Sequence, residues 1–219
     1  MHIVGIIQSY TDISGTMPEW LRNIAIGVGI IEVLAIATIA TAGIAGVSIG
    51  AALAAGFTGA SLGTGAAATV ATIATSAFAG AVIGGTTSTL ASGIMTACSG
   101  GSMEDVLNTS STSFMFGVAL GSFFGIVNPI TMATNEAVNI GIHMGINSIA
   151  SVGTYLGQTA YMYGNLKNIS VGRLIISSIG GATAGYLPNP VASNGYFNHL
   201  SIQGAMLFDY VSYVRKTYN

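Results

Sequence analysis

Apolar residues form long stretches along this 219-residue chain, and they predict a protein built from hydrophobic helices. Pro18 and Glu19 favour a helix start, because proline suits the first helical turn and a carboxylate suits its positive end. We expect the first helix to run from Trp20 to about Thr41, close to the ~20 residues that cross a bilayer core. Trp20 and Arg22, at its beginning, are residue types that prefer a membrane interface.

Further apolar stretches follow, separated by glycines. Residues 44–62 and 66–83 approach spanning length, so they predict a helical hairpin that ends at Gly84-Gly85. Residues 90–97 form an apolar stretch that is too short to cross a bilayer. A polar, glycine-containing turn follows, and it divides the chain into N-terminal insertion helices (1–103) and a second helical region (104–219).

The second region has shorter apolar segments. The pattern predicts helices over residues 114–127, 137–156 and 174–184, none of them a clear membrane span. A last, amphipathic helix is expected from Tyr196 to Tyr218. The fold class predicted from these patterns is all-α, made of hydrophobic helices and hairpins that insert into a membrane and are metastable when soluble.

The distribution of charge supports this interpretation. Residues 33–103 contain no Asp, Glu, Lys, Arg or His, and only 5% of the whole chain is charged, with a mean hydropathy of +0.71. Because a soluble domain has roughly a quarter of its residues charged, lipid or another protein must cover this surface. The chain has five basic residues and a net charge of −2, which argues against nucleic acid as a partner.

Small residues recur at intervals of four, a spacing that places them on one face of a helix. Glycine inside a helix costs about 1 kcal/mol relative to alanine, and close approach of two helices is the usual compensation. The pattern therefore predicts helix packing through glycine-zipper faces and a homo-oligomer in the membrane. The predicted packing residues are Gly46, Gly50, Gly117, Gly121, Gly125, Gly141, Gly145, Gly153 and Gly157.

Two titratable residues lie within apolar helical segments. Glu32 is in the middle of the first helix, where an ionised carboxylate is costly unless it is protonated, paired or facing a water-filled lumen. His143 is expected either as a hydrogen-bonded interior residue or as a group that is protonated at mildly acidic pH. We therefore treat Glu32 and His143 as candidate lumen-facing or pH-sensing residues.

No arrangement of residues matches a catalytic motif. The available acids, bases and nucleophiles lack the spacing of known hydrolase, zinc or phosphate-binding signatures. Cys98 is the single cysteine, so no internal disulfide or thiolate cluster is expected. The sequence thus predicts a protein that is not an enzyme and that has no catalytic residues, metal site or cofactor.

Two blocks of sequence resemble a region near the C-terminus of bacterial polymorphic toxins of the Rhs-repeat and LXG kinds. The first block is Met17-Pro18-Glu19-Trp20-Leu21-Arg22-Asn23-Ile24, followed by the apolar residues 33–38. The second is Gly101-Ser102-Met103-Glu104-Asp105-Val106-Leu107-Asn108, followed by Ser113-Phe114-Met115-Phe116-Gly117. Ser113 replaces the glycine that is usual in that family, and the resemblance ends at about residue 125.

The resemblance implies a secreted toxin tip that a secretion system delivers to the membrane of a rival bacterium. It also implies a delivery shell or chaperone and a cognate immunity protein as partners. Combined with the apolar helices, it favours a pore-forming tip that depolarises the target cell. Two other interpretations are a non-lethal translocation or packing module of a larger toxin, and a small integral membrane protein such as a holin.

Overall fold

The computed structural model describes residues 17–167, 169–186 and 202, and this part of the chain forms helices without strands. The all-α prediction is confirmed for these residues. The helices are α2 (Glu19–Ile44), α3 (Ile49–Thr58), α4 (Ala66–Cys98), α5 (Met103–Val127), α6 (Glu136–Tyr163) and α7 (Val171–Tyr186).

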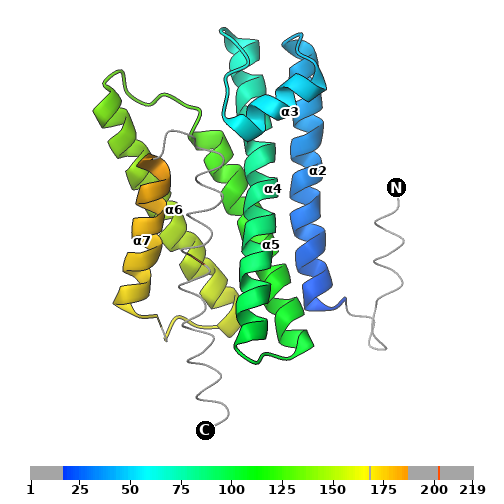
Figure 1. Cartoon of the computed structure of the whole chain (residues 1–219), viewed down its shortest axis with the longest axis vertical. Coiled ribbons are helices and arrows are strands. Elements are labelled where there is room, and N and C mark those ends of the chain that lie inside the picture. The colour runs from blue at the N-terminus through cyan, green and yellow to red at the C-terminus, as the bar shows by residue number, and fades with distance from the viewer. Residues whose placement is uncertain (1–16, 168, 187–201, 203–219) are drawn as a thin grey trace.

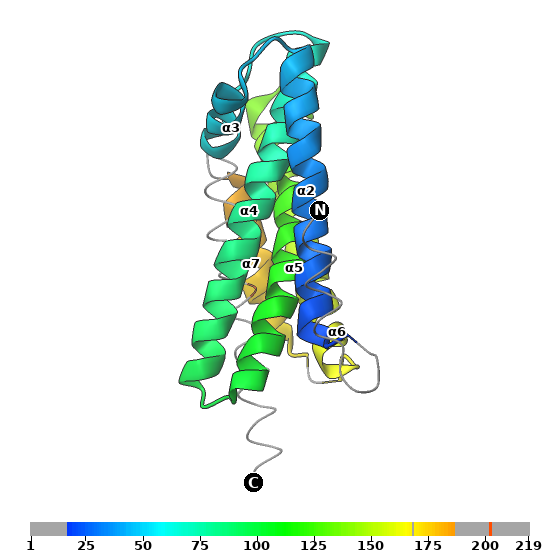
Figure 2. The same ribbon diagram turned by 90° about the vertical axis from the view of Figure 1, so that its right-hand side faces the viewer.

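The helices form two groups that lie side by side. Helices α2, α4 and α5 run along the long axis of the molecule, with the short α3 crossing near one end (Figures 1 and 2). Helices α6 and α7 form a second hairpin, which slants toward the α4–α5 turn (Figure 1). We call the first group the body and the second the arm.

Local side-chain chemistry explains where several helices begin and end. Ser102 and Asp105 form a reciprocal capping box at the start of α5, which satisfies backbone N–H groups that have no partner within the helix. Asn135 caps α6 by accepting from the backbone N–H of Val138 at 3.2 Å. Gly164 ends α6 with a φ of +67°, a left-handed conformation that glycine adopts without steric cost.

Helix α4 corrects the prediction of a break at Gly84-Gly85. The helix continues through both glycines for 33 residues and absorbs the apolar segment 90–97, which the sequence analysis had treated as separate. Both glycines are buried, and a Cβ on Gly85 would contact Phe114 and Val118 of α5. The glycine pair therefore makes room for α5 and does not end the helix.

The predicted N-terminal hairpin is also corrected. Helix α3 has only 10 residues, because Gly59 ends it with a φ of +73°, and it is too short to cross a bilayer. Helix α5 is longer than the predicted 114–127, since its polar first turns are helical as well. The long hairpin consists of α4 and α5, which are joined by the turn at residues 99–102.

Three helices of the described chain are long and apolar enough to cross a membrane: α2, α4 and α5. Helices α6 and α7 extend the predicted segments by several residues. The predicted C-terminal helix from Tyr196 to Tyr218 lies outside the described residues except for Ile202. Ile202 is buried and packs with Leu120, Phe124 and Tyr155.

Candidate functional site

Helices α4 and α5 meet along a row of small residues that we call the α4–α5 seam. On both helices the members follow each other at intervals of four, and all are buried. Spacing by four keeps them on one face, so the two helices approach closely along their whole contact. The seam consists of Ser76, Gly80, Gly84, Ser88, Ser92 and Thr96 on α4 and Thr109, Ser113, Gly117, Gly121 and Gly125 on α5.

The three glycines of α5 lie directly against the backbone of α4. A Cβ added to Gly121 would overlap the carbonyl group of Gly80, and one added to Gly80 would overlap that of Gly121. A Cβ on Gly117 or Gly125 would likewise overlap an α4 carbonyl group. Any larger side chain at these positions therefore has to push the helices apart.

Hydroxyl groups in and beside the α4–α5 seam find partners within the helices. The Thr75 hydroxyl donates to the carbonyl oxygen of Ala71 at 2.9 Å, and the Ser122 hydroxyl donates to that of Val118 at 2.6 Å. The hydroxyls of Thr96 and Thr109 lie 3.0 Å apart across the seam. Buried hydroxyl groups that are hydrogen-bonded in this way do not need water.

A second seam joins α6 and α7. A Cβ on Gly181 would overlap the Asn147 carbonyl group, and one on Gly185 would approach the His143 carbonyl oxygen to 2.6 Å. The arm is therefore a close-packed hairpin of its own. Phe114 connects helices of the body in a related way, because its ring fills the space that Cβ atoms on Gly27 of α2 and Gly85 of α4 would occupy.

Other glycines that the sequence analysis proposed for packing are placed differently. Gly46 lies in the turn after α2 with a φ of +69°, so it does not share a helical face with Gly50. Gly157 lies near Phe116, whose ring would be 3.3 Å from a Cβ at this position. Open space surrounds the remaining five: Gly46, Gly50, Gly141, Gly145 and Gly153 have no neighbour within 4 Å of an added Cβ.

Helix α2 is the least covered of the three long apolar helices. Only 11% of its most apolar 18-residue window is buried, compared with 50% in α4 and 56% in α5. Val33 and Ile36 are 67% and 68% exposed. Glu32 is also exposed, and among the described residues it makes no hydrogen bond or ion pair. This surface of α2 combines bulky apolar groups with one carboxyl group.

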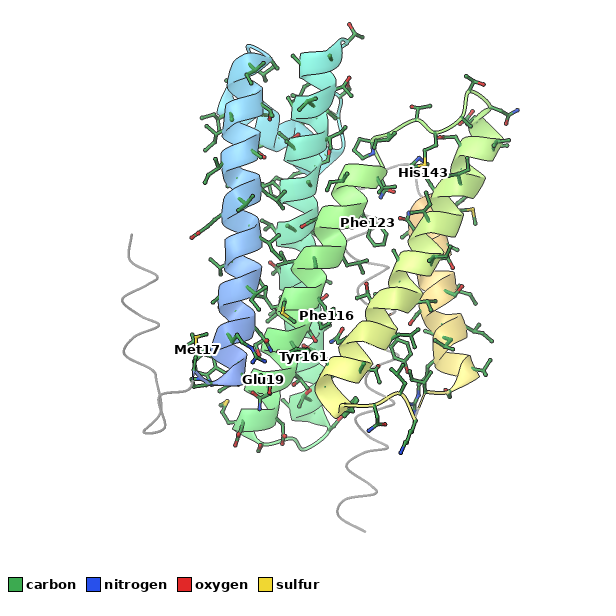
Figure 3. All side chains as sticks on the ribbon, turned by 180° about the vertical axis from the view of Figure 1, so that it is seen from behind. Met17, Glu19, Phe116, Phe123, His143 and Tyr161 are labelled. Atoms are coloured by element: carbon green, nitrogen blue, oxygen red, sulfur yellow. The ribbon has the colours of Figure 1, made fainter. Side chains whose placement is uncertain are left out.

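The beginning of α2 is tied to the end of α6 by polar contacts. The Arg22 guanidinium donates to the Tyr161 hydroxyl at 2.5 Å and lies 3.4 Å from Glu19. The Tyr161 hydroxyl donates to Asn23 Oδ1 at 2.7 Å, and Asn23 Nδ2 donates to the hydroxyl of Thr112 on α5 at 3.1 Å. Figure 3 shows Tyr161 and Glu19 close together at this end of the bundle.

His143 lies at the opposite end of α6, as Figure 3 shows, and its side chain is buried. Its Nε2 is 3.1 Å from the carbonyl oxygen of Ile130, so Nε2 carries the hydrogen and donates. Its Nδ1 has no hydrogen-bond partner among the described residues. One turn along α6, Asn147 Nδ2 donates to Asn128 Oδ1 at 3.3 Å. His143 thus fastens the α5–α6 connection to the arm.

An apolar groove of about 520 Å³ runs between α5 and α6. Aromatic rings of α5 line one wall, and Phe116 and Phe123 mark its length in Figure 3. At one end of the groove, the ring of Phe116 lies edge-on to that of Tyr161, with 5.9 Å between the ring centroids. Burial raises the pKa of the Tyr155 phenol nearby, so this side chain stays neutral at physiological pH.

Two parts of this arrangement escaped the sequence analysis. The α4 side of the seam is mostly serine and threonine, and a search for glycines alone passes over it, although its four-residue spacing is visible in the sequence. The contacts of Tyr161 join residues 138 and 139 positions apart. Short-range patterns carry no information about such pairs.

Among the described residues, no three His, Cys, Asp or Glu side chains come together in a group that could hold a metal ion. Three further side chains with acid or base groups, those of His2, His199 and Asp209, lie outside the described residues. Comparisons of the chain with protein-family models, with curated proteins and with solved structures return no match.

Proposed function

We propose that this chain is a pore-forming toxin tip that inserts into the membrane of a target bacterium, self-associates there and depolarises it. The exposed surface of α2 carries the proposal. A 26-residue apolar helix that the other described residues leave largely uncovered is stable in lipid, where its side chains need no other cover. Helices α4 and α5 supply two further segments of spanning length.

The small-residue faces divide into two kinds in this proposal. The α4–α5 seam builds a hairpin within one chain. The uncovered glycines Gly141 and Gly145, about one turn apart on α6, leave a small-residue patch for close packing of a second copy. Ile149, which is 76% exposed, follows in the same row and separates this patch from Gly153. Delivery, a covering chaperone or shell, and an immunity protein are proposed from the two sequence blocks that resemble polymorphic toxins.

The test is to measure membrane permeability directly. The purified chain is added to vesicles of phosphatidylethanolamine and phosphatidylglycerol that contain a fluorescent dye, and expression in bacteria is followed with a potential-sensitive dye. We expect dye release and depolarisation. Binding to vesicles without either effect would instead favour a translocation or packing module.

Self-association is tested at Gly145. Gly145→Ile adds a side chain in open space, so the monomer should fold as before. Because the new side chain keeps a second α6 at a distance, we expect at least a tenfold loss of dye release and fewer cross-linked oligomers. Gly29→Ile, also in open space but on α2, is the matched control. Equal dye release from Gly145→Ile and the unmodified chain would exclude α6 as the assembly face.

A further inference from the structure

We propose that the arm (α6 and α7) is detachable: a hydrogen-bond latch at Tyr161 holds it against the body, and its release uncovers the apolar face of α5. This inference rests on the proposed function, since lipid is what the uncovered face would meet. Three features of the structure support it: polar contacts at one end of α6, incomplete packing in its middle, and a connection at its other end that belongs to the arm.

The latch consists of two layers of hydrogen bonds. In the first, the Tyr161 hydroxyl bonds both Arg22 and Asn23 at the start of α2. In the second, one turn earlier on α6, Gln158 Nε2 donates to the hydroxyl of Ser113 on α5 at 2.7 Å. Asn23, Ser113 and Gln158 are fully or almost fully buried. These hydrogen bonds break when α6 moves away from α2 and α5. The latch is closed while they are formed and open once they are broken.

Above the latch, the arm and the body only partly meet. Leu120 and Phe124 of α5 pack with Tyr155 of α6 and with Ile202, and Phe116 lies against Gly157 and Tyr161. The apolar groove lies beside these contacts, so the two helices touch along only part of their length. By contrast, the α4–α5 and α6–α7 seams are each tight enough to exclude a Cβ. The arm–body interface is thus weaker than the packing inside either part, and the molecule should open along it.

The connection between α5 and α6 moves with the arm. The Asn139 side chain of α6 accepts from the backbone N–H groups of Met132 at 2.7 Å and Ala133 at 3.2 Å, and His143 binds the Ile130 carbonyl. Helix α5 ends just before this segment, at Val127 with Asn128 as its C-cap, and Pro129 has no N–H with which to continue it. The pivot therefore falls at Asn128-Pro129.

Distances between spin labels test the latch in the full chain in detergent micelles. One label is placed on Cys98, which is exposed at the end of α4, and the other on Lys167→Cys, beyond α6. Tyr161→Phe keeps the ring and removes two hydrogen bonds, so we expect the population of long distances to rise about tenfold. An unchanged distance distribution in Tyr161→Phe would overturn the latch.

Two controls accompany this measurement. Tyr186→Phe makes the same chemical change at an exposed position of α7 and should leave the distances as they are. Labels on Cys98 and Ala60→Cys lie within the body, and their separation should stay the same in Tyr161→Phe. A change in this second pair would show that the variant disturbs the body itself, and it would also overturn the proposal.

A reducible cross-link connects the latch with membrane activity. A thiol reagent that contains a disulfide joins Cys98 to Lys167→Cys and holds the arm closed. We expect the cross-linked chain to release at least tenfold less dye from the vesicles described above, and a reductant to restore release. Full release by the cross-linked chain would show that opening is not required. If the unmodified chain releases no dye, the proposed function fails, while the label distances still decide whether the latch exists.

Discussion

Glu32 shows how one residue constrains the placement of a helix. It lies near the middle of α2, where an acidic residue costs about 3 kcal/mol in a membrane-spanning helix. Apolar residues such as Ile contribute about −0.5 kcal/mol each, so half a dozen of them offset this cost, and α2 contains more than that number. The helix can therefore span a bilayer with Glu32 inside it.

Substitutions at Glu32 distinguish a lumen-facing carboxylate from a lipid-facing carboxyl group. If Glu32 faces a conducting lumen, Glu32→Gln should preserve insertion and reduce cation preference severalfold, and Glu32→Lys should invert the preference in planar-bilayer recordings. If the group only has to be neutral to enter lipid, Glu32→Gln should raise insertion at neutral pH and leave selectivity unchanged. Wild-type conductance and pH dependence in both variants would place Glu32 outside the membrane.

At the scale of helices, the close contact in the α4–α5 seam predicts that a larger side chain at Gly121 destabilises the hairpin. Gly121→Ile puts a branched side chain where even a Cβ overlaps the Gly80 backbone. Overpacking of this kind typically costs about 1–3 kcal/mol, so we expect the denaturation midpoint in detergent to fall and dye release to decrease with it. Gly29→Ile makes the same change in open space on α2 and should change the midpoint little. A normal midpoint in Gly121→Ile would mean that the seam does not stabilise the hairpin.

The sequence predicted which parts of the chain are helical better than where each helix ends. Apolar length and Pro18 placed α2 to within a few residues. Gly84-Gly85 was misread because glycine favours both a helix end and a close helix crossing, and only the presence of Phe114 and Val118 on the facing helix decides between them. Similarly, the polar residues at the start of α5 made the helix look shorter than it is. Capping residues belong to the helix although their hydropathy differs from that of the apolar segment after them.

Only one side of the α4–α5 seam could be predicted from the sequence. The glycines of α5 could be identified from their spacing, whereas the chain offered no way to choose α4 as the helix they contact. The Tyr161 contacts depend on how the arm folds back across the body, a property of tertiary structure alone.

For the whole molecule, the fluorescence of Trp20 tests the proposal that the body enters a membrane. Trp20 is the only tryptophan in the chain and lies at the beginning of α2. With α2 across the bilayer, we expect vesicles to shift the emission of Trp20 to shorter wavelength. A quencher attached to the lipid headgroup should reduce this fluorescence at least twofold more than a quencher at the end of the lipid acyl chains.

Two outcomes would contradict this placement. Stronger quenching from the centre of the bilayer would mean that α2 inserts at a different depth. Emission unchanged by vesicles would mean that α2 stays outside lipid. Trp20→Phe supplies the fluorescence blank for both measurements, because the chain then contains no tryptophan.

Because of the composition of the α4–α5 seam, the packing of the hairpin does not depend on whether water or lipid surrounds it. Bulky apolar cores lose their driving force in lipid, which is as apolar as they are. The seam instead depends on the shape of small residues and on hydroxyl groups, such as those of Ser92 and Thr109, that are bonded to carbonyl groups of their own helices. Neither contribution requires water to be expelled. Under the proposed function, the same pair of helices therefore passes from an aqueous carrier into a bilayer already assembled. The free-energy barrier to entry then comes from moving its outer surface, with no need to take the hairpin apart and rebuild it.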